Sequence, residues 1–283
     1  MNKDKMFLRV ATYNIEFSQQ REVIISNIDT MAKDGIMVFC LQEVARRGEN
    51  FIIDDLLKKL GNTWQAIYHL GNEGFPFGMG TCILWNGKVL HLKKSKEILL
   101  PKKTRIAFHE WLFAKIIGGK GIPFQRRSIA ACFQFGNYFI RISSIHLDHV
   151  GGVNHRQKQL NYFLSMLRDD SALDATYEII CGDFNSFDLL CSGKERQALH
   201  ENFGEEYQDI SQHVNWTADL YAMDMNNALK GIRLFIRTFS IHIRRKLDYI
   251  WDKNLKVIEC KKLELFGSDH FPVIATVYIE QNL

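Results

Sequence analysis

The chain has 283 residues, of which 46% are hydrophobic and 24% are charged, and its formal net charge is +4. This composition is ordinary for a soluble globular protein with a sizeable core. The mild positive charge is compatible with a phosphate-bearing substrate, but it argues against an extended nucleic-acid-binding arm.

Short apolar segments rich in β-branched residues recur along the whole chain and predict strands. In chain order they are FLRVATYNI, IMVFCLQEV, GTCILW, SIAACFQF, YFIRISSIHL, YEIICGDF, KLDYIWD and FPVIATVYI. Helical spacing of apolar residues appears between them at Val23–Lys33, Phe51–Leu60 and Arg156–Leu167, the last with Asn154 as an N-cap. Many strands with scattered helices predict two packed sheets covered by helices on the outside.

Two segments have no clear period. Lys93–Arg105 carries six basic residues and one acidic residue, which indicates either a solvated face or a basic surface near a cleft. Residues 229–246 space Leu229, Ile232 and Ile236 as a helix with basic residues elsewhere on the wheel, which would suit peripheral contact with a membrane. Phe239, Ile241 and Ile243 also alternate as a strand, so packing against the core is the competing interpretation.

Neither a repeat nor a flexible linker interrupts the chain, so we expect one domain over 1–283 and a monomer. The six cysteines show no metal-ligand spacing, and Cys40, Cys132 and Cys181 lie within strand-like runs, which indicates buried free thiols in a reducing compartment. The N-terminus has no cleavable signal, and no segment approaches the length of a membrane span. We therefore expect a cytoplasmic protein, with signal-independent export left open.

Polar residues that a strand does not need stand at the edges of several predicted strands. Taken singly, each has a structural explanation: a capped strand end, an Asx-rich turn, a satisfied histidine or a surface ion pair. They are Asn14 in TYNIEF, Glu43 in CLQEV, His146, Asp148 and His149 in SSIHLDH, Asp183 and Asn185 in CGDFNS, Asp248 in KLDYIW, and Asp269 and His270 in GSDHFPV.

Taken together, these residues predict a metal-dependent site. If the strand ends converge, Glu43, Asp183, Asp248 and Asp269 bring four carboxylates into one region, where like charges are costly unless cations neutralise them. Carboxylate and amide oxygens without thiolates suit Mg²⁺ or Mn²⁺. The neighbouring histidines offer proton transfer or positive charge for a phosphoryl group.

The succession TYN, LQE, IHLDH, GDFNS, LDYIW and SDHFPV resembles the endonuclease/exonuclease/phosphatase superfamily, which includes deoxyribonuclease I. The resemblance extends from about residue 8 to residue 279, and GDFN and SDHFPV are its most specific parts. It implies a four-layered α/β sandwich, in which two packed mixed sheets are flanked by helices. It also implies a divalent-metal-dependent phosphoester hydrolase.

By position, the resemblance assigns metal binding to Asn14, Glu43 and Asp269, with Glu43 as the principal ligand. Asp183 and Asn185 would handle the attacking water and a phosphate oxygen, with Asp183 as the expected base. His270 would face the scissile phosphate, oriented and kept charged by Asp248. His146 matches the second histidine of the deoxyribonuclease, phosphatase and sphingomyelinase branches, and counts against the abasic-site endonuclease branch.

The substrate is less well defined than the reaction. Arg126, Arg127 and Arg156 are candidates for substrate binding, with a solvated strand edge or helix surface as the alternative. Nucleic acid is the first expectation for the phosphodiester, and a phospholipid such as sphingomyelin or an inositol phosphate is the second. A non-catalytic binding module on the same fold would have lost at least one of the residues that the resemblance assigns to metal binding or catalysis. All eight are present: Asn14, Glu43, His146, Asp183, Asn185, Asp248, Asp269 and His270.

Overall fold

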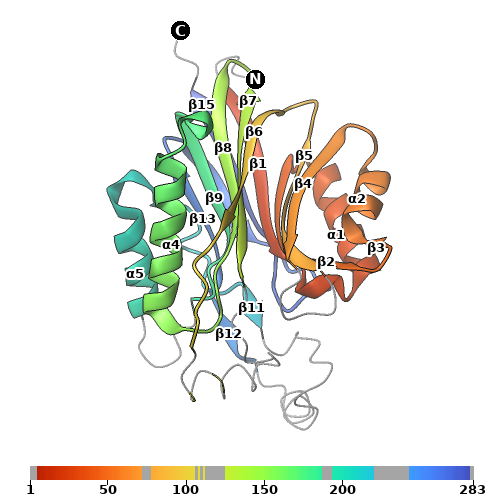
Figure 1. The fold of residues 1–283 in the computed structure, drawn as a ribbon. Coiled ribbons are helices and arrows are strands. Elements are labelled where there is room, and N and C mark those ends of the chain that lie inside the picture. Colours follow the sequence, from red (N-terminus) through yellow and green to blue (C-terminus); the bar gives the residue numbers. More distant parts are fainter. Residues whose placement is uncertain are drawn as a thin grey trace.

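The computed structural model describes residues 5–71, 78–105, 108, 111, 125–186, 193–219 and 242–280. Within these residues, two mixed β-sheets pack face to face (Figure 1). The first sheet has the order β14-β15-β1-β2-β5-β4, with β3 paired to β2, and the second has the order β10-β13-β9-β8-β7-β6. A small separate ladder joins β11 and β12.

The strands of the first sheet are β1 (Lys5–Asn14), β2 (Val38–Arg47), β3 (Asn50–Phe51), β4 (Trp64–Gly71), β5 (Gly78–Asn86), β14 (Lys256–Lys262) and β15 (Val273–Glu280). Those of the second are β6 (His91–Leu99), β7 (Arg127–Phe135), β8 (Tyr138–His146), β9 (Tyr177–Asp183), β10 (Gln208–Asp209) and β13 (Asp248–Lys253). The small ladder joins β11 (Ala218–Asp219) to β12 (Arg244–Arg245). In each large sheet one central pair is parallel, β1 with β2 and β8 with β9.

Helices cover the outer face of each sheet. In Figure 1, α4 (Gly152–Arg168) and α5 (Lys194–Phe203) lie on the left, and α1 (Arg21–Lys33) and α2 (Ile52–Leu60) lie on the right. Strand β1 shows how one strand serves two layers, because Val10 packs between the sheets while Ala11 packs under α1 and α2. This burial on both faces explains the near-continuous apolar runs of the sequence. The predicted four-layered sandwich of two packed mixed sheets is confirmed.

The predicted elements and the observed ones differ in several places. Helix α4 begins at Gly152 behind Gly151, whose φ is +101°, so Asn154 lies in the first turn and is not the N-cap. Helix α5 and strands β4 and β14 were not predicted. The basic segment Lys93–Arg105 was wrongly taken as irregular, because residues up to Leu99 belong to edge strand β6. Lysines on an edge strand discourage pairing with another chain, which explains the unusual composition.

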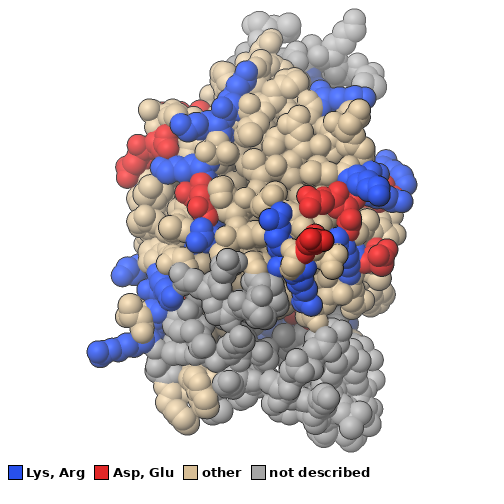
Figure 2. Space-filling view, turned by 45° about the vertical axis from the view of Figure 1, so that its right-hand side comes forward, with Lys and Arg blue, Asp and Glu red and all other residues tan. Residues whose placement is uncertain are grey.

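Other sequence expectations have mixed outcomes. Cys40, Cys82, Cys132, Cys181 and Cys260 are buried free thiols, as predicted. Most of the segment 229–246 lies outside the described residues, so its membrane interpretation stays a prediction. No helix in the described ranges is both long and apolar enough to span a bilayer. On the face shown in Figure 2, basic and acidic side chains of the described residues are interspersed.

Candidate active site

Three of the predicted residues occupy one row across three neighbouring strands. His146 ends β8, Asp183 ends β9, and Asp248 begins β13. The register pairs His146 with Asp183 across the parallel ladder and Asp248 with Asp183 across the antiparallel one. Residues directly opposite each other in a sheet project from the same face, so the ladder itself gathers these side chains.

Asp183 lies at the centre of this row and is 1% exposed. Its Oδ2 accepts a hydrogen bond from Asn14 Nδ2 at 2.9 Å, and its Oδ1 accepts one from the backbone N–H of Asn185 at 2.8 Å. Asn185 has a φ of +48° and donates from Nδ2 to the carbonyl of Leu147 at 2.9 Å. Burial raises the pKa of Asp183 to about 6, with the positive charge of His270 opposing the shift and Asp248 reinforcing it. A base with this pKa can accept a proton near neutral pH.

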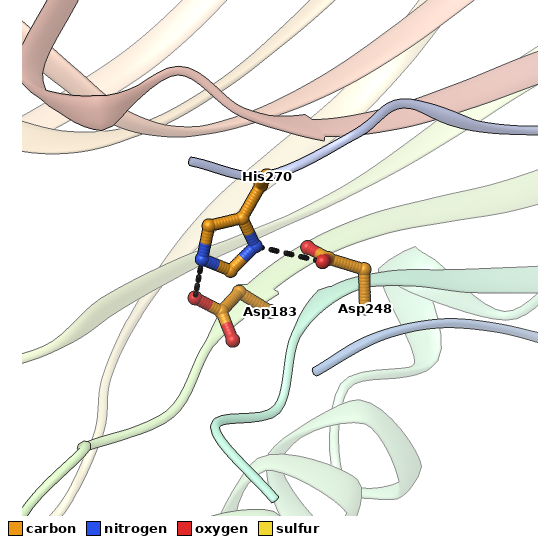
Figure 3. A group of neighbouring side chains, drawn as sticks. All are labelled: Asp183, Asp248 and His270. Carbon is orange, nitrogen blue, oxygen red and sulfur yellow. Dashed lines mark hydrogen bonds and ion pairs between the residues drawn. The ribbon is translucent and has the colours of Figure 1, made fainter. Parts of the chain in front are cut away.

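His270 connects Asp248 to Asp183 (Figure 3). Its Nδ1 donates to Asp248 Oδ2 at 2.7 Å, and its Nε2 lies 3.8 Å from Asp183 Oδ2. Burial alone would lower the pKa of His270, but the carboxylates of Asp248, Asp269 and Asp183 outweigh it and raise the pKa well above its usual range. The imidazole is therefore charged at neutral pH, with Nε2–H directed away from Asp248.

His146 has a different environment. Its Nδ1 contacts Arg126 Nη1 at 3.2 Å, while its Nε2 lies 3.5 Å from Asp183 Oδ2 and 3.8 Å from Glu43 Oε1. Burial lowers the pKa of His146 well below its usual value, and the positive charges of Arg126, His149 and His270 lower it further. His146 is therefore a neutral imidazole at neutral pH.

A β-bulge places Glu43 at the site. The register between β2 and β5 shifts between Leu41 and Val44, and Glu43 has a φ of +56°. Leu41 and Val44 both pack under the helices although they are three residues apart, so one extra residue has been inserted. Such an insertion re-aims a side chain. Burial raises the pKa of Glu43 to about 7, and Asp269 adds to the increase.

The loop before β15 brings Asp269 and His270 to the same place. Ser268 Oγ donates to the carbonyl of Asn14 at 2.7 Å, which ties the loop to the end of β1. The backbone N–H of His270 donates to Ser268 Oγ at 3.1 Å. Asp269 is half-buried, and burial raises the pKa of its carboxyl.

The charges of this cluster fit a divalent cation. Four carboxylates, from Glu43, Asp183, Asp248 and Asp269, face one imidazolium. Burial is the main cause of the raised pKa values of Glu43, Asp183 and Asp269, and the neighbouring carboxylates add to it. Oxygen donors of this kind suit Mg²⁺ or Mn²⁺. Ligand atoms of Asp183, Asp248 and His270 also lie within 4.8 Å of one another, but the imidazolium among them opposes a cation there.

The three arginines predicted to bind substrate are all engaged with other residues. Arg126 is 5% exposed and contacts Asp148, His146 and His149. Arg127 pairs with Glu97 across the ladder between β7 and β6. Arg156, which is also buried, donates to the carbonyl of Asp148 at 3.2 Å and pairs with Glu195. Their role in substrate binding stays a prediction.

Sequence reasoning missed Thr217 and Ser268 as supports of the site. Thr217 Oγ1 accepts hydrogen bonds from the backbone N–H groups of Leu247 and Asp248, both at 3.0 Å, and so fixes the start of β13. Ser268 belongs to the GSDH motif, whose carboxylate and imidazole attracted attention first. Thr217 has no local signal, because it meets β13 only through the tertiary fold.

A four-layered α/β sandwich with carboxylates, amides and two histidines at one end of its paired sheets has the fold of the endonuclease/exonuclease/phosphatase proteins. Solved structures agree. D. rerio TDP2 complexed with a single-strand DNA product has a TM-score of 0.67 and 16% identity, covering 96% of this chain and 98% of that one. The Bacteroides vulgatus endonuclease/exonuclease/phosphatase has a TM-score of 0.68 and 15% identity, covering 97% and 100%.

ANGEL2, a 2′,3′-cyclic phosphatase, has a TM-score of 0.64 and 14% identity, covering 97% of this chain and 95% of that one. No protein-family model and no curated protein sequence matches the chain. The resemblance predicted from the motifs is thus confirmed in the fold, over nearly the whole chain.

Proposed function

We propose that the protein is a divalent-metal-dependent phosphodiesterase that directs water onto phosphorus, with nucleic acid as its substrate. The observation that carries the proposal is the arrangement around Asp183 Oδ2. Asn14 donates to this oxygen, and the Nε2 atoms of His146 and His270 lie 3.5 and 3.8 Å from it. One buried base is thereby surrounded by groups suited to orient water and to stabilise a phosphoryl oxygen.

Asp183 would accept the proton of the attacking water. Asn14 and the backbone N–H of Asn185 hold its carboxylate in one orientation, so that water bound to it has a defined direction of attack. A pKa raised to about 6 by burial makes Asp183 a stronger base than an exposed aspartate and leaves it ionised at pH 7.

His270 would stabilise the negative charge that develops on the phosphoryl oxygens. Asp248 holds Nδ1 at 2.7 Å and keeps the ring charged, so Nε2–H is a cationic donor fixed in place before the substrate arrives. Preorganised donors aimed at developing charge are among the largest contributions to catalysis.

Glu43, Asn14 and Asp269 are the residues that would hold the metal. Their oxygen donors and the excess negative charge of the cluster favour Mg²⁺ or Mn²⁺. When bound, the ion would supply Lewis-acid stabilisation of a phosphoryl oxygen and would neutralise the carboxylates.

Nucleic acid is favoured as substrate by the surroundings of the site. Arg46 and Arg47 continue β2 beyond Glu43 and are exposed, and Arg244 is exposed on β12, whose partner β11 bridges to His270. Phe266 is 73% exposed immediately before the GSDH loop. Cations follow a phosphate backbone, and an exposed aromatic ring stacks on bases. The TDP2 neighbour, which holds single-strand DNA, supports the same choice.

Hydrolysis of a panel of substrates tests the proposal. Single-stranded DNA, plasmid DNA, RNA, inositol phosphates and sphingomyelin would be incubated with Mg²⁺, with Mn²⁺ and with EDTA, beside an Asp183→Asn control. We expect cleavage of nucleic acid that EDTA abolishes. The absence of turnover on every substrate with either metal would refute the hydrolase, and support a binding module. Turnover of sphingomyelin or of inositol phosphate, without cleavage of nucleic acid, would refute nucleic acid as the substrate and support a phospholipid or an inositol phosphate instead.

Phe266 allows a sharper test of the substrate. Replacing Phe266 with Ala should raise KM for single-stranded DNA about tenfold, since stacking contributes about 1–3 kcal/mol per base. KM for an all-abasic oligonucleotide of the same length should stay unchanged, because that substrate has no bases to stack. Equal effects on both substrates would contradict base recognition at this position.

A further inference from the structure

A buried polar network lies behind His146, on the side away from Asp183. Arg126 is at its centre, and each nitrogen of its guanidinium has a partner. Nε donates to Asp148 Oδ1 at 3.3 Å, Nη1 contacts His146 Nδ1 at 3.2 Å, and Nη2 contacts His149 Nδ1 at 3.0 Å. Arg126 and Asp148 are 5% and 0% exposed, so the charged pair is well shielded from water.

The chemistry of Arg126 determines the protonation pattern of His146. A guanidinium has only donors, so His146 Nδ1 must be the acceptor of their hydrogen bond. In a neutral imidazole the proton then resides on Nε2. This Nε2 has no hydrogen-bond partner within the described part of the chain, although it is buried and points between Asp183 and Glu43. It is thus a neutral donor directed at the place where the substrate would bind.

We propose that Arg126 is a positioning residue that fixes His146 as the Nε2–H tautomer and aims this donor at a phosphoryl oxygen of the substrate. The inference rests on the proposed function for the identity of the acceptor, but the tautomer itself can be measured without any substrate. It differs from the sequence prediction that Arg126 contacts the phosphate, because the guanidinium acts here through the imidazole.

The same network gives a role to Asp148 in the HLDH motif. Asp148 Oδ2 contacts His155 Nε2 at 3.4 Å, its backbone N–H donates to Gln159 Oε1 at 2.9 Å, and its carbonyl accepts from Arg156. All three partners come from α4, so the helix fixes the position of Asp148. Asp148 in turn orients Arg126, and Arg126 orients His146. A flexible surface arginine would lose this orientation.

Nuclear magnetic resonance tests the tautomer directly. In long-range ¹H–¹⁵N spectra of histidine-labelled, metal-free protein at pH 7.5, we expect an unprotonated Nδ1 and a protonated Nε2 for His146, assigned by its loss in His146→Gln. Wild-type protein with the proton on Nδ1, or with both nitrogens protonated, would overturn the inference. In Arg126→Met the Nδ1–H form should appear, whereas Arg126→Lys should keep the wild-type pattern. An unchanged tautomer in Arg126→Met would also overturn it.

Kinetics separate positioning from direct substrate binding. Arg126→Met should lower kcat about 10- to 100-fold, as loss of a group that orients a functional residue commonly does, and should leave KM near the wild-type value. The double variant with His146→Gln should be no slower than His146→Gln alone. A raised KM with unchanged kcat, or additive losses in the double variant, would overturn the inference and favour phosphate binding by Arg126.

Arg141→Met is the matched control. Arg141 is as buried as Arg126 and pairs with the buried Glu178, but it lies on the part of β8 that is remote from His146. It should lower stability as Arg126→Met does, yet leave kcat and the tautomer of His146 unchanged. If the hydrolysis panel fails while the tautomer is as expected, the proposed function falls and the geometry of the network stands.

Discussion

Replacing Asp248 with Asn tests the charge on His270, on which the proposed mechanism depends. The substitution keeps the size of the side chain but removes the negative charge 2.7 Å from His270 Nδ1. Because burial lowers the pKa of His270 and carboxylates raise it, losing Asp248, the largest of the raising contributions, shifts the balance toward the neutral imidazole.

The expected magnitude follows from the burial of the pair. Asp248 is 1% exposed and His270 is 5% exposed, and breaking a buried pair by removing one partner costs about 3–5 kcal/mol. If this energy is lost from stabilisation of the charged ring, kcat should fall about 150- to 5,000-fold, since each 1.36 kcal/mol corresponds to a factor of ten. KM should change little, because the cationic donor matters most when charge develops on phosphorus.

The assay is Mg²⁺-dependent turnover of the best substrate of the panel, with kcat and KM determined separately. Asp252→Asn is the matched control, because Asp252 is a buried aspartate further along the same strand, where its Oδ2 accepts a hydrogen bond from the backbone N–H of Leu255. It should retain wild-type kcat. A folded Asp248→Asn variant with kcat within about threefold of wild type would refute the reasoning that a charged His270 is required.

Three other variants have defined outcomes. Burial raises the pKa of Asp252 to about 6, whereas the pKa is about 4 in the unfolded chain, so the wild-type protein loses stability as pH rises between these values. Relative to wild type, Asp252→Asn should therefore raise the free energy of unfolding by about 1–2 kcal/mol at pH 8 and leave it unchanged below pH 4, as measured by urea unfolding. Glu43→Gln should abolish the increase in Tm that Mg²⁺ gives the wild-type protein, and an unchanged increase would exclude Glu43 as a ligand. In Gly182→Ala the added Cβ would overlap the backbone oxygen of Ile145, so the free energy of unfolding should fall by about 2–3 kcal/mol in the same assay. An unchanged free energy of unfolding would show that β8 and β9 can move apart at little cost.

The fold was predictable because its strands are buried on both faces and its polar residues stand out against that background. Asn14, Asp183 and Asp248 stand at strand ends, where the apolar pattern stops, and each is found there in the structure. Neither the bulge that turns Glu43 nor the positive φ of Asn185 could be predicted, because both depend on neighbouring strands rather than on local sequence.

The supporting residues were harder to predict for the same reason. Arg126 follows a segment with no recognisable pattern, and its partners Asp148 and His149 come from another strand end. A basic side chain just before a strand is usually exposed to solvent, so the sequence treats Arg126 and its neighbour Arg127 alike. Only their tertiary contacts show that Arg126 supports the site and Arg127 does not. Burial is the property that separates the two, and burial at a strand end is decided by the whole fold.

The two histidines of the site have opposite partners, and the difference has a chemical consequence. Asp248 stands behind His270 and keeps it charged, whereas burial, together with Arg126 behind the ring, lowers the pKa of His146 and keeps it neutral. Both rings direct Nε2 toward Asp183 Oδ2. Two imidazolium ions beside this carboxylate would lower its pKa and weaken it as a base. In the proposed mechanism, one charged and one neutral ring would provide two donors for the phosphoryl group while leaving Asp183 basic enough to accept a proton from water.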